Sequence, residues 1–243
     1  MGYDLNTKGR VHSFFTGGMV DGPGIRTVVF LAGCNLRCKY CHNPDTWQVL
    51  RGDEMSVGEV LDEVLKYKSY YKFSGGGVTV SGGEPMLQAR FLTEILAACR
   101  DHGIHTTLDT SGSASRANAE EILKYTSLLL LDIKTINPEV YFELTKVHLD
   151  KTIGVLDAAR ELGVPAWVRF VLVPGITDDI EDIRKLAEFL KRYENVTNIE
   201  VLPFHKDGEY KWQDLNIPYD LGGVRVPTAE EVRAVKKALG VKS

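Results

Sequence analysis

The 243-residue chain lacks any run of about 18 or more apolar residues, so no membrane-spanning helix is predicted. It begins Met1-Gly-Tyr-Asp-Leu-Asn, without the basic and then apolar segments of a secretory signal. Its net charge of −4 includes no excess of positive charge that would favour nucleic acid as a partner. We therefore expect a cytoplasmic protein that binds neither membranes nor nucleic acid.

Cysteine is scarce and unevenly placed. Three of the four cysteines, Cys34, Cys38 and Cys41, fall within eight residues, and the fourth is Cys99. Disulfide frameworks are typical of small secreted domains, and this chain is neither small nor visibly secreted. The three close cysteines are therefore predicted to be metal ligands. Cys99 ends the apolar stretch 91–99 and is predicted to be a buried helical residue instead.

Apolar segments alternate between strand-like and helix-like patterns. Predicted strands, rich in Val, Ile and Leu as if buried on both faces, cover 26–31, 77–80, 104–108, 128–133, 166–173 and 198–202. Helices are predicted over 56–68, 89–102, 117–125, 151–162, 178–193 and 228–239. Two of them begin with the spacing of a capping box, Ser56 with Glu59 and Thr228 with Glu231.

Six alternating strand–helix units predict an α/β fold with a parallel sheet, either open and doubly wound or barrel-like. A full eight-unit barrel usually takes about 250 residues, and the six units here fall short of it. The Gly-rich segments 1–25 and 204–227 are expected to be loops or flaps. We expect one domain over residues 1–243.

The cysteine spacing, Cys-x3-Cys-x2-Cys, favours an iron–sulfur cluster. Cys34, Cys38 and Cys41 can hold three corners of a 4Fe–4S cluster, which would leave one iron open for another ligand. Zinc would need a fourth ligand, and His42 is a candidate, although its adjacency to Cys41 makes binding of one ion awkward. An iron–sulfur electron carrier and a zinc-binding module thus remain as alternatives of another class.

The cysteine motif resembles that of the radical S-adenosylmethionine superfamily. Within it, the chain is most similar to the glycyl-radical activases of the pyruvate formate-lyase type. Matching stretches are 9–14, 20–26, 34–47, 74–79, 81–84, 108–110, 131–134, 173–175 and 202–205. The resemblance implies a partial (β/α)6 TIM-like barrel with a core of about 26–205, an N-terminal extension and a C-terminal loop plus helix. The eight-cysteine insert of some other activases is absent from this sequence.

The resemblance also implies an activity. A 4Fe–4S cluster would reductively cleave S-adenosylmethionine to methionine and a 5′-deoxyadenosyl radical, which would take a hydrogen atom from one glycine of pyruvate formate-lyase. Reduced flavodoxin or ferredoxin would supply the electron, and the enzyme would be a monomer. The nearest alternatives are an activase of another glycyl-radical enzyme and a radical enzyme acting on a small molecule.

Site residues are carried over from the matching motifs. S-Adenosylmethionine contacts are expected from Lys39, Tyr40, Cys41, Gly82, Gly83, Glu84, Asp132, Ile133, Lys134, Arg169 and His205. A monovalent cation, sodium or potassium, is expected at Asp109, Thr110 and Asp132, and the glycyl peptide at Asp21 and His42.

The order of predicted strands along the chain supports some of these site residues independently of the resemblance. Cys34, Gly82, Asp109, Asp132 and His205 follow or end different predicted strands, and α/β folds place active sites at those ends. Strand alternation puts Asp132 and Lys134 on one face, and a buried Arg169 would need a carboxylate partner. The loop 206–223, with Tyr210, Trp212 and Tyr219, is expected either to contact a partner protein or to pack on its own barrel.

Overall fold

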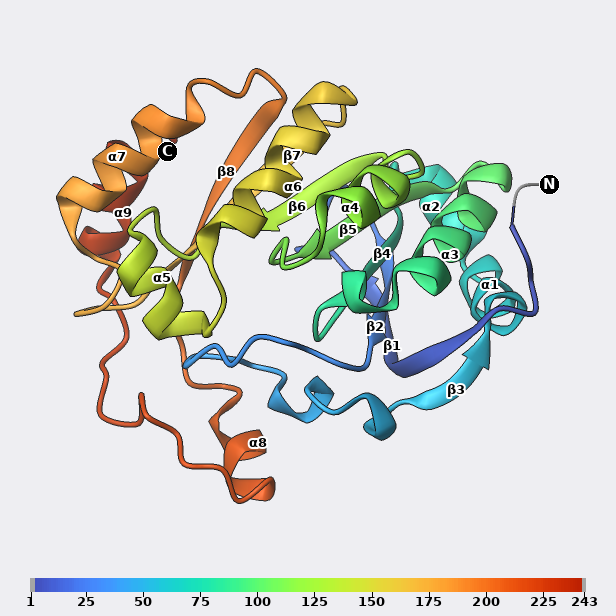
Figure 1. Cartoon of the computed structure of the whole chain (residues 1–243), viewed down its shortest axis with the longest axis horizontal. Coiled ribbons are helices and arrows are strands. Elements are labelled where there is room, and N and C mark those ends of the chain that lie inside the picture. Colours follow the sequence, from blue (N-terminus) through green and yellow to red (C-terminus); the bar gives the residue numbers. More distant parts are fainter. Residues whose placement is uncertain (1–2, 242–243) are drawn as a thin grey trace.

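The computed structural model describes residues 3–241 and places their strands in one sheet, in the order β3-β1-β2-β4-β5-β6-β7-β8. The pairs from β2 to β8 are all parallel, while β1 is antiparallel to β2 and β3. Within the described chain β3 and β8 are the two edges, so the sheet is open (Figure 1). The strands are β1 Lys8–Gly18, β2 Arg26–Leu31, β3 Asp53–Ser56, β4 Gly77–Gly82, β5 His105–Thr110, β6 Leu128–Asp132, β7 Ala166–Leu172 and β8 Val196–Pro203.

All six predicted strands and all six predicted helices are present. The α-helices are α1 Val57–Leu65, α2 Lys68–Ser74, α3 Ala89–Asp101, α4 Arg116–Leu123, α5 Pro138–Thr145, α6 Leu149–Glu161, α7 Ile180–Leu190, α8 Glu209–Asp214 and α9 Ala229–Ala238. Short 3-10 turns are η1 Pro44–Thr46, η2 Val49–Arg51 and η3 Pro85–Gln88. Both capping boxes form, at the start of α1 and of α9. None of the described helices combines the length and the apolar character that crossing a membrane requires.

The main core lies between the sheet and the helices that cover it. Helices α1, α3, α4 and α6 pack side by side in that order against the sheet (Figure 1). Their apolar stripes meet buried strand residues such as Val80, Leu108 and Leu129 in one cluster. Cys99 is 0% exposed on α3 and belongs to this cluster, which confirms the prediction of a buried helical residue.

The expectation of an irregular N-terminal segment 1–25 is wrong for 8–18, which forms β1. This strand pairs along β2, but its register shifts between Val11 and Ser13 and again between Thr16 and Gly18. The two irregularities disturb the period-2 pattern, and Gly9, Gly17 and Gly18 further hide the strand in the sequence. The short elements β3, α2, α5 and α8 were also outside the prediction.

The expected burial on both faces holds for β2, β4, β5 and most of β6, but not for β7 and β8. In β7, half-buried residues alternate with buried ones, because Arg169 and Val171 face a cavity. Strand β8 is only partly buried, since it is an edge of the sheet. The open side of the sheet and the cavity therefore account for the difference.

Candidate active site

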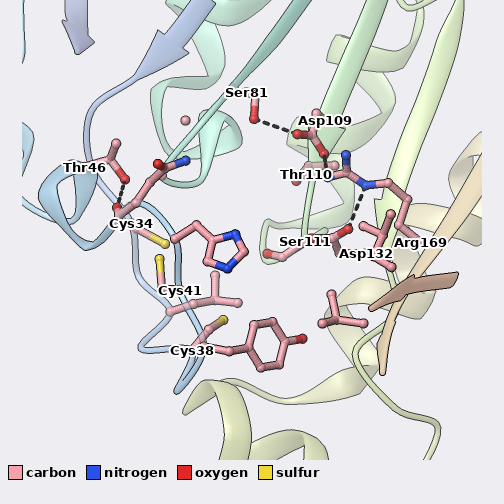
Figure 2. Close-up of a pocket in the computed structure, with 18 of the residues that line it drawn as sticks. Cys34, Cys38, Cys41, Thr46, Ser81, Asp109, Thr110, Ser111, Asp132 and Arg169 are labelled. Atoms are coloured by element: carbon pink, nitrogen blue, oxygen red, sulfur yellow. Dashed lines mark hydrogen bonds and ion pairs between the residues drawn. The ribbon is translucent and has the colours of Figure 1, made fainter. Parts of the chain in front are cut away.

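A cavity of about 530 Å³ opens at the carboxyl ends of the parallel strands (Figure 2). Its lining includes fourteen of the seventeen predicted site residues: Asp21, Cys34, Cys38, Tyr40, Cys41, His42, Gly82, Gly83, Asp109, Thr110, Asp132, Lys134, Arg169 and His205. The fold thus gathers side chains that are spread over nearly two hundred positions of the sequence. This convergence follows from parallel strands, whose ends meet at one edge.

Three cysteines form one wall of this cavity. They lie on the loop after β2, and Figure 2 shows their sulfurs facing the same space. Main-chain hydrogen bonds fix the loop: the Cys34 amide donates to the Trp47 carbonyl at 3.1 Å, and the Arg37 amide donates to the Thr145 carbonyl at 2.8 Å. The loop therefore presents its thiols from a backbone that is tied to two other segments.

Burial leaves these thiols neutral when no metal is bound. It raises the pKa of Cys34 and of Cys38 to about 12, and Lys134 lowers that of Cys38 only in part. Burial also raises the pKa of Cys41, against hydrogen bonds from the Asn43 backbone and the Trp47 side chain. Metal binding would thus have to displace protons from the three thiols.

The opposite wall is a network of charged side chains on strand ends. Arg169 on β7 donates from Nε to Asp132 Oδ1 at 3.0 Å and from Nη2 to Asp109 Oδ1 (Figure 2). Lys134 Nζ donates to Asp132 Oδ2 at 2.5 Å, and Ser81 Oγ donates to Asp109 Oδ2 at 2.6 Å. The predictions that Asp132 and Lys134 share a face and that Arg169 meets a carboxylate are confirmed.

Mutual attraction keeps this network charged despite burial. Burial by itself would raise the pKa of Asp132, but Arg169 and Lys134 lower it to about 2. Burial likewise opposes the charge on Lys134, yet Asp132 raises the pKa of that ammonium well above its usual value. Two carboxylates and two cations therefore face the cavity together, and they can hydrogen-bond a polar or zwitterionic ligand.

Glu84 does not line the cavity. Its side chain is 1% exposed, and it accepts hydrogen bonds from Thr110 Oγ1 at 2.5 Å, Ser111 Oγ at 2.5 Å and the Met86 amide at 3.1 Å. The carboxylate therefore joins the end of β5 to the start of η3. Two other predicted cofactor residues lie outside the lining as well: Ile133 is buried in the main core, and the Lys39 side chain is partly exposed.

The predicted peptide residues lie at separate parts of the lining. His42 packs its ring against that of His205, 4.2 Å between centroids, and its Nε2 lies 3.2 Å from the His205 carbonyl. Asp21 follows β1, and its carbonyl accepts a hydrogen bond from Thr79 at 2.7 Å. Burial raises the pKa of the Asp21 carboxyl. Because its ring is engaged with the 205 segment, His42 is poorly placed as a zinc ligand.

Sequence reasoning missed several residues of the site. Ser81 orients Asp109, and Trp47 lines the cavity beside Cys41. Arg26 is fully buried outside the cavity lining, where it donates to Thr79 at 2.6 Å and to the Pro23 carbonyl at 2.9 Å. Ser81 and Trp47 fall within the matching motifs, so their position was the available signal. Arg26 also falls within a matching stretch, 20–26, but that position does not reveal its contacts, which depend on tertiary structure.

Comparison with known proteins decides the family. The sequence profile of the Radical SAM superfamily matches residues 28–190. The chain belongs to this superfamily. A relative from Listeria monocytogenes named pyruvate formate-lyase-activating enzyme is 46% identical, covering 97% of this chain and 97% of its own. A relative of the same name from Clostridium pasteurianum is 47% identical, covering 95% of this chain and 97% of its own. A solved domain of such an enzyme from Bacteroides vulgatus is 28% identical, with TM-score 0.58, and covers 69% of this chain and 97% of its own.

Radical SAM membership implies a 4Fe–4S cluster and S-adenosylmethionine, and the site fits both. Three soft sulfur donors line one wall, as a cluster with one open iron requires. Tyr40 also lines the cavity, and its buried hydroxyl has no hydrogen-bond partner among residues 3–241. Such a group is satisfied when a polar ligand fills the space. In the same described range, no three His, Cys, Asp or Glu side chains are grouped as ligands of one metal ion.

Proposed function

We propose that this chain activates pyruvate formate-lyase by generating a radical on one of its glycines. The observation that carries the proposal is the pairing of three cysteine thiols with a buried charged network across one cavity. Relatives at 46% and 47% identity, over nearly the whole chain, bear the name of that activase.

When bound, the reduced cluster would supply one electron to the sulfonium of S-adenosylmethionine, giving methionine and a 5′-deoxyadenosyl radical that takes a hydrogen atom from glycine. Cys34, Cys38 and Cys41 would hold the cluster. The protein's other residues bind and orient S-adenosylmethionine and keep water out of the cavity.

Asp132 and Lys134 are proposed to bind opposite ends of S-adenosylmethionine. The carboxylate of Asp132 can accept from ribose hydroxyls, and the ammonium of Lys134 can donate to a carboxylate. Arg169 holds Asp132 in place through its 3.0 Å hydrogen bond. His205, half-exposed at the cavity mouth, would complete the contacts.

The Gly82–Gly83 turn is proposed to bind the amino group of S-adenosylmethionine through its backbone. A side-chain Cβ at Gly82 would lie 2.2 Å from the Leu31 carbonyl oxygen, and one at Gly83 would lie 2.2 Å from that of Gly33. The turn therefore packs backbone against backbone on the cysteine loop. Only glycine permits this approach, which keeps peptide groups beside both the thiols and the cavity.

Asp21 and His42 are proposed to contact the glycyl peptide. Both line the cavity, and a carboxylate and an imidazole can bind peptide N–H and C=O groups. Asp109, Thr110 and Asp132 would hold a sodium or potassium ion. In the present structure Asp109 and Asp132 already accept from Arg169, so the ion would have to share them or displace that side chain. A monomer that receives its electron from flavodoxin or ferredoxin completes the proposal.

The test is anaerobic incubation of the reconstituted, reduced protein with S-adenosylmethionine and pyruvate formate-lyase. We expect a glycyl radical by electron paramagnetic resonance and an equivalent amount of 5′-deoxyadenosine. Formation of 5′-deoxyadenosine without a glycyl radical would contradict this target and would favour another glycyl-radical enzyme or a small molecule. Absence of 5′-deoxyadenosine would contradict the enzyme itself and would leave an electron carrier.

A further inference from the structure

Residues 205–219, which we name the clasp, pack against the cysteine loop. The clasp contains α8, and Figure 1 shows this helix beside the η1 turn of that loop. Trp212 Nε1 donates to the Cys41 carbonyl at 2.8 Å, and Lys211 Nζ donates to Asn43 Oδ1 at 2.9 Å. Lys211 also pairs with Asp45 at 3.1 Å. The contacts therefore begin at the third cysteine and continue to η1.

Two indole rings pack together next to Cys41. Trp212 is 5% exposed and meets Trp47 edge to face, 5.1 Å between ring centroids. Trp212 donates a hydrogen bond to the Cys41 carbonyl, and Trp47 lines the cavity together with Cys41. Tyr219 also packs against Trp212, with 5.2 Å between the ring centroids. The aromatic side chains of the clasp thus pack on their own protein, except for Tyr210, which is 58% exposed.

The three cysteines are supported differently. The segment from Cys34 to Lys39 is tied by main-chain hydrogen bonds to Trp47, Leu144 and Thr145. The Cys41 amide bonds only within its own turn, to the Cys38 carbonyl at 3.1 Å. Support for Cys41 from outside the loop comes from Trp212, which lies 171 positions away in the sequence. The third cysteine therefore depends on the clasp more than the first two do.

We propose that Trp212 is a positioning residue for Cys41, and that the clasp controls how firmly the third cysteine holds its metal. A hydrogen-bonded partner behind a metal ligand fixes the orientation of that ligand, and its loss commonly weakens metal binding by about 10- to 100-fold. Because Trp212 bonds the peptide group of Cys41 rather than the sulfur, its effect should lie at the low end of that range. The inference rests on cluster binding by this superfamily, and it does not depend on which protein is activated.

A substitution at Gly208 tests the contact between the clasp and the cysteine loop independently of Trp212. It precedes α8 with an ordinary right-handed backbone, φ −89° and ψ −3°, so alanine is compatible with its conformation. A Cβ there would lie 2.7 Å from the Cα of His42, which directly follows Cys41. Gly208→Ala would therefore push the clasp away from the loop without removing a hydrogen-bonding group.

The experiment compares Trp212→Phe with Trp167→Phe, a tryptophan on β7 outside the cavity lining. Both variants are reconstituted anaerobically with iron and sulfide. Release of iron to a chelator and the electron paramagnetic resonance spectrum of the reduced protein are then recorded. We expect Trp212→Phe to release iron roughly tenfold faster, the factor that corresponds to about one net hydrogen bond, and to alter the spectrum. Trp167→Phe should match the parent protein in both.

Wild-type iron release and an unchanged spectrum in Trp212→Phe would overturn the proposal. If that variant does not fold, the same measurements on Gly208→Ala decide the matter, with Gly223→Ala as control because open space surrounds that glycine. Faster iron release from Gly208→Ala than from Gly223→Ala would support the proposed role of the clasp. Equal iron release from the two variants would refute it. Neither readout uses pyruvate formate-lyase, so a wrong target would leave this outcome unaffected.

Discussion

The two walls of the cavity are built in different ways. Asp109, Asp132 and Arg169 belong to neighbouring strands, and sheet register sets Asp132 directly beside Arg169. The cysteines instead lie on an irregular loop, whose position depends on hydrogen bonds to α5 and to the clasp. The charged wall is therefore rigid because of the sheet itself, whereas the sulfur wall is held by segments distant in the sequence.

Charge also differs between the walls. The ion pairs leave the charged wall ionised and balanced without a ligand, while burial keeps the thiols protonated until a metal replaces their protons. One wall is thus preorganised for a polar ligand, and the other is completed only by its metal. Substitutions in the two walls should consequently fail in different ways.

Cys38→Ala should have the largest effect. Removal of one of three thiolates should prevent stable binding of a 4Fe–4S cluster, so iron content and S-adenosylmethionine cleavage should fall by about 100-fold or more. Iron analysis and measurement of 5′-deoxyadenosine would check this. Cys99→Ala is the matched control, since Cys99 has an equally raised thiol pKa of about 12 but is packed within α3. It should retain its cluster; loss of iron there would contradict the assignment.

Asp132→Asn should leave the cysteines intact and destabilise the fold instead. Arg169 and Lys134 would lose their shared carboxylate, and breaking a buried ion pair costs about 3–5 kcal/mol. Urea denaturation at neutral pH would measure the free energy of unfolding. Glu188→Gln, which removes an exposed pair with Lys191, should leave the free energy of unfolding nearly unchanged, because solvent screens an exposed ion pair. Equal effects of the two would contradict the preorganised wall.

The same variant predicts a pH dependence. The pKa of Asp132 is about 2 in the folded chain, below the value of about 3.9 in an unfolded chain. Its contribution is therefore present in full above about pH 4 and lost as the pH falls toward 2. The difference in unfolding free energy between the parent and Asp132→Asn should shrink over this window, and a constant difference would argue against the ion pairs.

Glu84→Gln separates a structural role from cofactor binding. The amide can accept fewer of the hydrogen bonds that the carboxylate receives from Thr110, Ser111 and Met86, so stability should fall by about 1–3 kcal/mol. At a temperature where the variant is folded, the KM for S-adenosylmethionine should change by less than about threefold. A larger rise in KM with unchanged stability would place Glu84 at the ligand.

Lys39→Ala should have the smallest effect. Its side chain is partly exposed and lies outside the cavity lining, so the KM for S-adenosylmethionine should change by less than about twofold. Lys134→Ala provides the contrast, because that ammonium is buried within the cavity wall. Similar losses in both would show that the side chain of Lys39 reaches the ligand.

The charged wall was the more predictable from the sequence. Strand alternation places Asp132 and Lys134 on one face, and an arginine inside an apolar strand requires a carboxylate, as found for Arg169. The sulfur wall was predictable only for its ligands. The bond from Trp212 to Cys41 joins segments 171 positions apart, and no local pattern encodes it. Strand β1 was missed for a local reason, since glycines and register shifts erase its alternation.

The most direct test concerns the one iron of the cluster that a loop with three cysteines should leave without a protein ligand. Iron analysis and electron paramagnetic resonance of the anaerobically reconstituted, reduced protein would be recorded with and without S-adenosylmethionine. We predict about four irons per chain and a spectrum that changes when S-adenosylmethionine binds the open iron. A single bound zinc, or a cluster whose spectrum does not change when S-adenosylmethionine is added, would contradict the account.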